Sequence, residues 1–394
     1  MTDKKEKSKE NINSEENATG SNSIPEEDDA MFSCPNENKE MTARDWNRIG
    51  RDLMSAGAVE EALVAFNNGL ALDPQSFDLL KNKADALSRS GQKDDSLKMY
   101  EDALEMYPDN AKLLCFAGFE VLESGDREKA ISYFEKSVAL EPDIALSWFG
   151  KGLAFGEMME FEKAIECYDK TIEISPDFTK ALIGKAISLS ALGEYEQAIL
   201  FFNRALELDP NDVEIWYYKA LAYDALGDGA NAVIGYEKIL EEHPDFDDAW
   251  NNLGILKNAM GQFDDALIAF DRAIDINSEQ ADVWFNKGYT HAMLGDFESA
   301  VKAFEEAILI APDFENAYME AAFASVQMGK TDKALMLYEQ VLTIQPSAEA
   351  WFGKGICHLA ANDMKKAENA FEKAYEIDPR YKELVDAQMK KTGC

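Results

Sequence analysis

The sequence has no hydrophobic run long enough to cross a membrane, and it has very little histidine. No stretch approaches the roughly 18 consecutive apolar residues of a transmembrane helix, so we expect no membrane association. The first residues, MTDKKEKSKENINSEENATG, lack the apolar core of a signal peptide, and we expect a cytoplasmic protein. The three histidines, His243, His291 and His358, leave few candidates for acid–base chemistry or metal binding.

Cysteine and positive charge are also scarce. The five cysteines are odd in number, scattered and never arranged as C-x-x-C, which argues against a disulfide framework or a zinc site. We interpret them as reduced packing residues. The 39 Lys and Arg residues are outnumbered by 75 Asp and Glu residues, which gives a formal net charge of −36. Because phosphate binding needs clustered cations, we expect no nucleic-acid partner.

The motifs of common catalytic sites are absent as well. The sequence contains no G-x4-G-K-S/T loop, no H-E-x-x-H, no G-x-S-x-G and no EF-hand loop. Its many DD and EE pairs are adjacent residues, which point apart on a helix and are solvated by default. We therefore expect a protein that is not an enzyme and that needs no metal or cofactor.

A strict repeat is present instead. Nine of the 11 prolines follow a 34-residue period, with one final interval of 33 and one gap at which Ser278 stands. These prolines are Pro74, Pro108, Pro142, Pro176, Pro210, Pro244, Pro312, Pro346 and Pro379. Each of the six tryptophans stands 28 residues before one of these positions or before Ser278. A fixed period of 34 indicates a repeat array, not separate globular domains.

Ten units align when each of these prolines is numbered 32. Position 24 is aromatic in all ten units, position 20 is Ala in nine, and position 8 is always Gly or Ala. Position 15 is glycine in eight units, with Met159 and Asn362 as the exceptions. Positions 4, 7, 8 and 11 share one helical face, and positions 20, 24 and 27 share another. Each unit is therefore predicted to be a helical hairpin, in which the glycine at position 15 ends the first helix and the proline ends the second.

This pattern resembles the tetratricopeptide repeat family, most clearly in AWNNLGILKNAMGQFDDALIAFDRAIDIN at 249–277. The resemblance implies an all-α fold, a right-handed α-α superhelical solenoid of ten units over residues 43–381. One departure recurs at position 7, where the family usually has Leu. Six units have Lys there: Lys83, Lys151, Lys185, Lys219, Lys287 and Lys354. A lysine stem covers apolar surface while its ammonium reaches water, so we expect the fold to tolerate the change.

The two ends of the chain differ from the array. Residues 1–42 are rich in Ser, Asn, Glu and Lys and carry four consecutive acidic residues at 26–29. Such a segment cannot bury enough surface to offset its ordering entropy, so we expect a disordered acidic tail. Residues 382–394 continue an amphipathic pattern, which predicts a C-terminal capping helix over the last unit.

The resemblance also implies a binding surface, because in this family positions 2, 5, 6, 9, 12 and 13 of the first helices face a concave groove. At these positions the chain begins basic, becomes apolar and aromatic in its middle units, and ends acidic. The implied partner-binding residues are Arg44, Arg48, Arg51, Lys81, Phe149, Leu153, Ile183, Ile187, Tyr217, Leu221, Asn251, Asn252, Ile255, Phe285, Asn286 and Tyr289. The acidic positions are Glu214, Asp224, Asp248, Asp282, Glu320 and Glu349. Asparagine amides both donate and accept, which suits them to a peptide backbone.

The leading functional hypothesis is a non-catalytic scaffold that holds an extended segment of another protein in this groove. Three alternatives stay open: a co-chaperone or accessory subunit of a separate enzyme complex, head-to-tail self-assembly, and autoinhibition by the acidic tail at the arginines. The carboxylate clamp of chaperone-binding family members is not present. Lys81 stands at its first position, position 5, but position 9 of the same unit is Asp85 and position 6 of the next unit is Phe116.

Overall fold

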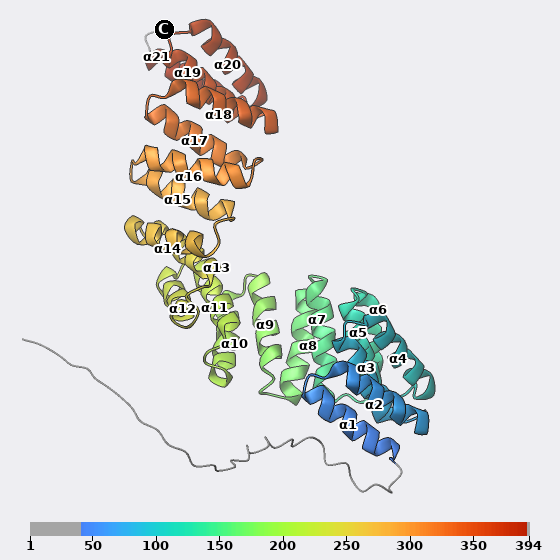
Figure 1. Ribbon diagram of the computed structural model, residues 1–394. Coiled ribbons are helices and arrows are strands. Elements are labelled where there is room, and N and C mark those ends of the chain that lie inside the picture. Colours follow the sequence, from blue (N-terminus) through green and yellow to red (C-terminus); the bar gives the residue numbers. More distant parts are fainter. Residues whose placement is uncertain (1–40, 392–394) are drawn as a thin grey trace, which may run out of the picture.

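The computed structural model describes residues 41–391; the predicted acidic tail, apart from its last two residues, and the last three residues of the chain lie outside the described part. Within that part the chain forms 21 α-helices and no strand. Successive helices pack in antiparallel pairs, and the pairs stack into a long curved array (Figure 1). The predicted all-α solenoid of ten helical hairpins is confirmed.

The first helix of each unit covers positions 1–13 of the repeat, and the second covers positions 17–30. The first helices are α1 (Ala43–Ser55), α3 (Phe77–Arg89), α5 (Ala111–Glu123), α7 (Ala145–Glu157), α9 (Thr179–Ala191), α11 (Val213–Ala225), α13 (Asp247–Ala259), α15 (Ala281–Met293), α17 (Glu315–Gln327) and α19 (Ala348–Ala360). The second helices are α2 (Val59–Leu72), α4 (Lys93–Met106), α6 (Arg127–Leu140), α8 (Phe161–Ile174), α10 (Tyr195–Leu208), α12 (Gly229–Glu242), α14 (Phe263–Ile276), α16 (Phe297–Ile310), α18 (Thr331–Ile344) and α20 (Met364–Ile377). A further helix, α21 (Tyr381–Lys391), packs against α19 and α20.

Position 15 ends the first helix through a left-handed backbone conformation. The eight glycines there have φ between 71 and 90°, where the absence of a Cβ avoids strain. Met159 and Asn362 adopt the same conformation with φ of 59 and 61°. The next N–H then donates to the carbonyl of position 11, as Glu160 does to Phe155 at 2.9 Å. The turn geometry is thus common to all ten units, whichever residue occupies it.

The core of each unit is an aromatic ring at position 24 packed against a small residue at position 8. A Cβ added at Gly50 would lie 2.3 Å from Phe66 Cε1, and one at Gly355 would lie 2.3 Å from Phe371 Cε1. Both rings are fully buried. The close approach of the two helices therefore explains why position 8 is restricted to Gly or Ala.

The carbonyl at position 32 has a structural role that does not depend on proline. The indole Nε1–H at position 4 of the following unit donates to this carbonyl at 2.9 to 3.0 Å. The pairs are Trp148 with Pro142, Trp216 with Pro210, Trp250 with Pro244, and Trp284 with Ser278. Because Ser278 supplies the same acceptor, the interrupted proline period leaves the contact between the units intact.

In four of the six units that have it, the recurrent lysine at position 7 forms an ion pair with an acidic residue at position 25 of the preceding unit. Four such pairs have N–O distances of 2.5 to 3.0 Å: Lys151–Glu135, Lys185–Asp169, Lys287–Asp271 and Lys354–Glu339. The lysine side chains are only 11 to 21% exposed, so their stems pack between the units. Lys219 differs because Asn203 stands opposite; it lies 4.5 Å from the Trp216 ring centroid, and burial lowers its pKa.

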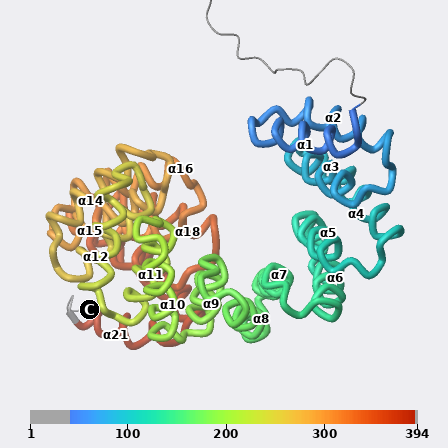
Figure 2. Tube along the Cα trace, turned by 90° about the horizontal axis from the view of Figure 1, so that it is seen from below, coloured from blue at the N-terminus to red at the C-terminus, as the bar shows by residue number. Residues whose placement is uncertain are grey.

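The first helices lie on the inner side of the array. Each packs against its partner, and successive first helices also contact one another, as α1 contacts α3 and α17 contacts α19. Between residues 41 and 391, no second helix contacts the next second helix as closely as these first helices contact each other. Figure 2 shows the resulting curve, with α7–α10 connecting the N-terminal units to the coiled C-terminal half. None of the helices described is both long and apolar enough to span a membrane.

Candidate functional site

An apolar stripe runs along the inner helices at position 9 of the repeat. Eight consecutive units from α5 to α19 have an apolar or aromatic residue there: Phe119, Leu153, Ile187, Leu221, Ile255, Tyr289, Phe323 and Ile356. The side chains become most exposed on α13, α15 and α17, where Ile255 is 41%, Tyr289 42% and Phe323 49% exposed. We call this set the position-9 stripe. The stripe is longer than the set of binding residues expected from the sequence. Phe119, Phe323 and Ile356 were not in that set, although all three share the repeat position of Tyr289.

A cavity of about 590 Å³ opens on the stripe between α13 and α15. Four of the residues expected at the binding surface line it: Ile255, Phe285, Asn286 and Tyr289. The Phe285 ring is held in place by Phe304 and Phe314, with centroid distances of 5.5 and 5.0 Å. The structure thus brings together, around one hollow, residues that the sequence places on two successive units.

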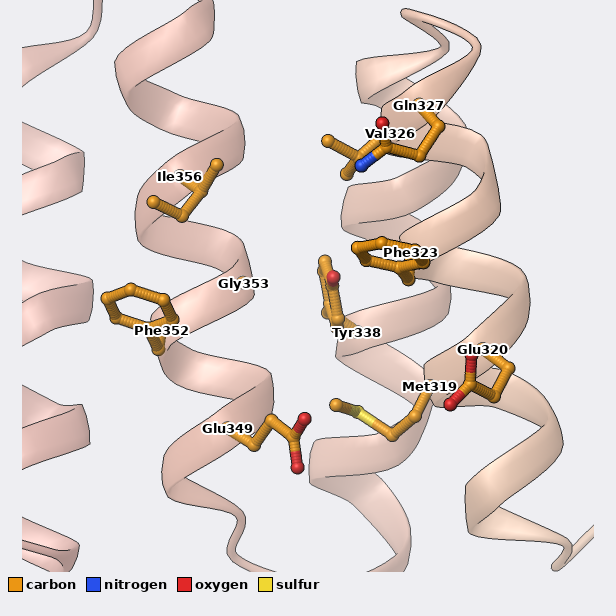
Figure 3. A pocket seen from close by; sticks show the side chains of 10 residues that line it. All are labelled: Met319, Glu320, Phe323, Val326, Gln327, Tyr338, Glu349, Phe352, Gly353 and Ile356. Carbon is orange, nitrogen blue, oxygen red and sulfur yellow. The ribbon is translucent and has the colours of Figure 1, made fainter. Parts of the chain in front are cut away.

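A second cavity of about 460 Å³ lies between α17 and α19 (Figure 3). Its apolar lining includes Phe323 and Ile356 of the position-9 stripe together with Met319, Val326 and Phe352. Glu320 and Glu349 also line it. Burial, followed by the charge of Glu349, raises the pKa of Glu320. The two carboxylates occupy acidic groove positions expected from the repeat register, whereas the apolar residues around them were not among the expected binding residues.

Phe149 is the least accessible of the expected binding residues, because it is only 7% exposed. Its ring packs 4.9 Å from that of Phe178 and 6.0 Å from that of Tyr168. It forms one wall of a third cavity, of about 510 Å³, which Phe119 also lines. Most of the Phe149 side chain therefore belongs to the packing between units.

The other expected residues of the middle units are half-buried on the inner side. They are Leu153, Ile183, Ile187, Tyr217 and Leu221. Tyr217 packs against Tyr236 and Phe246, with centroid distances of 6.1 and 5.4 Å, and burial raises the pKa of its hydroxyl. These side chains are therefore less accessible than Ile255, Tyr289 and Phe323 of the position-9 stripe.

The three expected asparagines are linked to neighbouring units by side-chain hydrogen bonds. Asn286 Nδ2 donates to Asn251 Oδ1 at 3.2 Å, and Asn252 Nδ2 donates to the Tyr217 hydroxyl at 3.3 Å. Asn82 donates to Asn47 Oδ1 in the same way at 2.8 Å, although neither was expected at the site. An amide has two N–H donors and an acceptor, so each of these bonds leaves further groups for a partner.

The N-terminal end of the inner side carries exposed arginines. Arg44, Arg48 and Arg51 are exposed on α1, and Arg51 lines a cavity of about 240 Å³ with Arg89. Asp85 lines the same cavity and pairs with Lys81 at 2.5 Å. The charge of Lys81 is therefore balanced within its own helix. The positive charge available to a partner comes from Arg44, Arg48 and Arg51. We call these three residues the arginine end.

Models of one family match nearly the whole repeat region. A model described as the TPR domain of cytochrome c-type biogenesis protein H matches residues 37–144. Models described as TPR repeat or tetratricopeptide repeat match residues 145–178, 188–227, 214–245, 247–280, 281–314 and 321–382. No curated protein matches the chain. The segments 145–178, 247–280 and 281–314 each coincide with one helical hairpin.

Solved structures resemble the chain at low identity. A tetratricopeptide repeat protein from Parabacteroides merdae ATCC 43184 is 21% identical with a TM-score of 0.47, over 64% of this chain and 99% of that one. The MamA protein is 22% identical with a TM-score of 0.41, over 45% and 94%. The APC/C hetero-tetramer Cut9–Hcn1 is 22% identical with a TM-score of 0.45, over 78% and 59%.

Proposed function

Because the chain belongs to the tetratricopeptide repeat family, whose members generally bind other proteins, we propose that it is a non-catalytic scaffold for an extended protein segment. The segment lies along the inner helices and follows the curve of the array. The described residues offer no cluster of His, Cys, Asp and Glu that would hold a metal ion, and the proposed role needs none.

The position-9 stripe carries this proposal. Ile255, Tyr289 and Phe323 line the cavities between α13 and α15 and between α17 and α19, whereas Leu200 and Ile234, which are more exposed on second helices, line neither. The cavities beside them accept side chains, and the half-buried asparagines offer hydrogen bonds to a peptide backbone. A partner segment would thus gain apolar burial and backbone hydrogen bonds from the same surface.

Charge gives the proposed complex a direction. The arginine end suits acidic residues of the partner, whereas Asp248 and Asp282, both exposed on the inner helices α13 and α15, suit basic ones. Exposed charge pairs are screened within about 8–10 Å at physiological ionic strength. We therefore expect added salt to weaken binding, while the contribution of the stripe remains.

The test compares two double variants in a crosslinked pull-down from the native cell. I255A/Y289A shortens the stripe, and L200A/I234A makes a similar change on second helices, where Leu200 is 64% and Ile234 57% exposed. We expect the inner variant to lose the partners captured by the parent protein and the outer variant to retain them. Equal capture by all three proteins would refute the assignment of the binding surface.

A further inference from the structure

The cavity between α17 and α19 has apolar walls and two carboxylates at one end. Figure 3 shows Glu320 and Glu349 on opposite walls at the same end of the cavity, with Met319 between them. Phe323 lies further along the same wall as Glu320 and is 49% exposed. The volume of about 460 Å³ falls within the range of roughly 300–1,000 Å³ that is typical of ligand pockets.

A glycine at position 6 of the last unit shapes this cavity. A Cβ at Gly353 would lie 2.3 Å from Tyr338 Cζ, so the bare backbone lets the Tyr338 ring close the floor. Tyr338 is only 5% exposed, whereas Phe323 is 49% exposed and Ile356 is half-buried. The Tyr338 ring thus fills the floor of the cavity, and Phe323 leaves apolar surface open to solvent.

The two carboxylates are not neutralised by the protein. Among the described residues, neither Glu320 nor Glu349 forms an ion pair, whereas the nearby Lys354 pairs with Glu339 at 3.0 Å. Burial and the charge of Glu349 raise the pKa of Glu320, which means that its charged form is unfavourable in the free protein. A cation beside these carboxylates would offset this unfavourable interaction and gain charge-assisted hydrogen bonds.

The neighbouring cavity between α13 and α15 provides an internal comparison. It is larger, at about 590 Å³, and is lined by apolar residues and by the amides of Asn258 and Asn286, with no acidic residue in its lining. Burial of apolar surface favours an apolar side chain in either cavity. Of the two, only the cavity between α17 and α19 also has carboxylates that favour a positive charge.

We propose that the cavity between α17 and α19 takes a large apolar side chain of the partner segment whose neighbour in sequence is lysine or arginine. The apolar side chain packs against Phe323 and Ile356, and the cationic group lies at the end of the cavity where Glu320 and Glu349 stand. The inference rests on the proposed function and adds the chemistry of the partner at this end of the array. An acidic segment is rejected here because its carboxylates would face two like charges.

The test uses a displayed library of random 12-residue peptides selected on the full chain, with subtraction of peptides that also bind the F323A variant. We expect the remaining peptides to contain an apolar residue next to Lys or Arg. Their affinity should fall about ten-fold in F323A, as expected for the lost burial of an aromatic side chain. It should fall about five-fold in E320Q/E349Q at low salt, near the upper range for exposed charge pairs.

Matched controls lie on the second helices of the same two units. M336A removes a side chain that is 67% exposed, and E368Q/E372Q removes two exposed carboxylates from α20; neither should change peptide affinity. Circular dichroism verifies that each variant keeps its helices. In addition, E320K/E349K should reverse the preference toward peptides in which Asp or Glu follows the apolar residue.

Each contrary outcome overturns the inference in a distinguishable way. Peptides that survive subtraction without a basic residue, or no surviving peptides, would refute the role of the cavity. Peptides selected on the full chain without the subtraction step that lose affinity in I255A/Y289A but not in F323A would refute it while leaving the proposed function intact. A dimer in light scattering that F323A abolishes would place a second copy of this chain in the cavity. Peptides whose affinity is unchanged in every variant of the inner helices would contradict both proposals.

Discussion

Met159 offers a direct test of how the turn at position 15 stabilises each unit. Its φ of 59° places an L side chain in the left-handed region, where eight other units have glycine. The side chain itself is 77% exposed, so its removal loses little packing. The hydrogen bond from Glu160 N–H to the Phe155 carbonyl already matches that of the glycine turns. The substitution Met159→Gly therefore relieves backbone strain and changes little else.

The magnitude follows from two opposing effects. Left-handed backbone costs an L residue about 1–2 kcal/mol, which glycine avoids. Glycine also has more freedom in the unfolded chain, which removes about 0.4–1 kcal/mol of the gain. The free energy of unfolding should therefore rise by about 0.5–1 kcal/mol. Asn362 should gain less from the same change, because asparagine tolerates this conformation better than methionine.

Amide hydrogen exchange is the most suitable assay, because repeat arrays unfold locally as well as globally. Exchange in α7 and α8 should slow by about two- to five-fold in M159G, and the denaturant midpoint should rise. M159A is the matched control, since it removes the same side chain but keeps the Cβ that causes the strain. Unchanged exchange in M159G, or an equal gain in M159A, would refute the strain-based explanation.

Four further predictions concern charge and assembly. N203D gives Lys219 the acidic partner that four other units have; the pKa of Lys219 by NMR should rise, with a gain in stability below about 1 kcal/mol. The raised pKa of Glu320 favours its protonated form in the folded chain, so the free energy of unfolding declines as pH rises through that pKa. In thermal melts, E320Q should therefore be more stable than the parent protein at neutral pH, and this difference should vanish near about pH 4. Deletion of residues 1–40 should raise partner affinity in titration calorimetry if the acidic run competes at the arginine end, and unchanged affinity excludes autoinhibition. Light scattering over a concentration series should give a constant monomer mass; growth with concentration favours head-to-tail assembly.

Periodicity made most of the fold predictable from the sequence. Position 24, position 8 and position 15 each have one structural role in every unit, so the hairpins, their turns and their core follow from the register. The role of Ser278 was not predictable, because it depends on a backbone carbonyl that accepts from Trp284. Any residue supplies such a carbonyl, so the sequence alone does not show that proline is dispensable there.

The candidate site was predictable in position but not in exposure. Phe149 and Phe285 occupy the same position 5, yet Phe149 is 7% exposed, whereas Phe285 is half-buried and lines an open cavity. This difference depends on the rings packed around each of them and on the curve of the array, which a repeat register does not contain. The pairing of Lys81 with Asp85 likewise removes a cation that the sequence pattern assigned to the partner surface.

The central claim is that a partner segment lies along the inner helices, and site-specific photo-crosslinking in the cell tests it most directly. A photoreactive phenylalanine at Tyr289 places the crosslinker on the position-9 stripe, and one at Ile234 places it on the exposed face of α12 as the matched control. The account predicts that a protein is crosslinked at Tyr289, through one contiguous segment, and not at Ile234. Crosslinking of the same protein at Ile234 alone would contradict it.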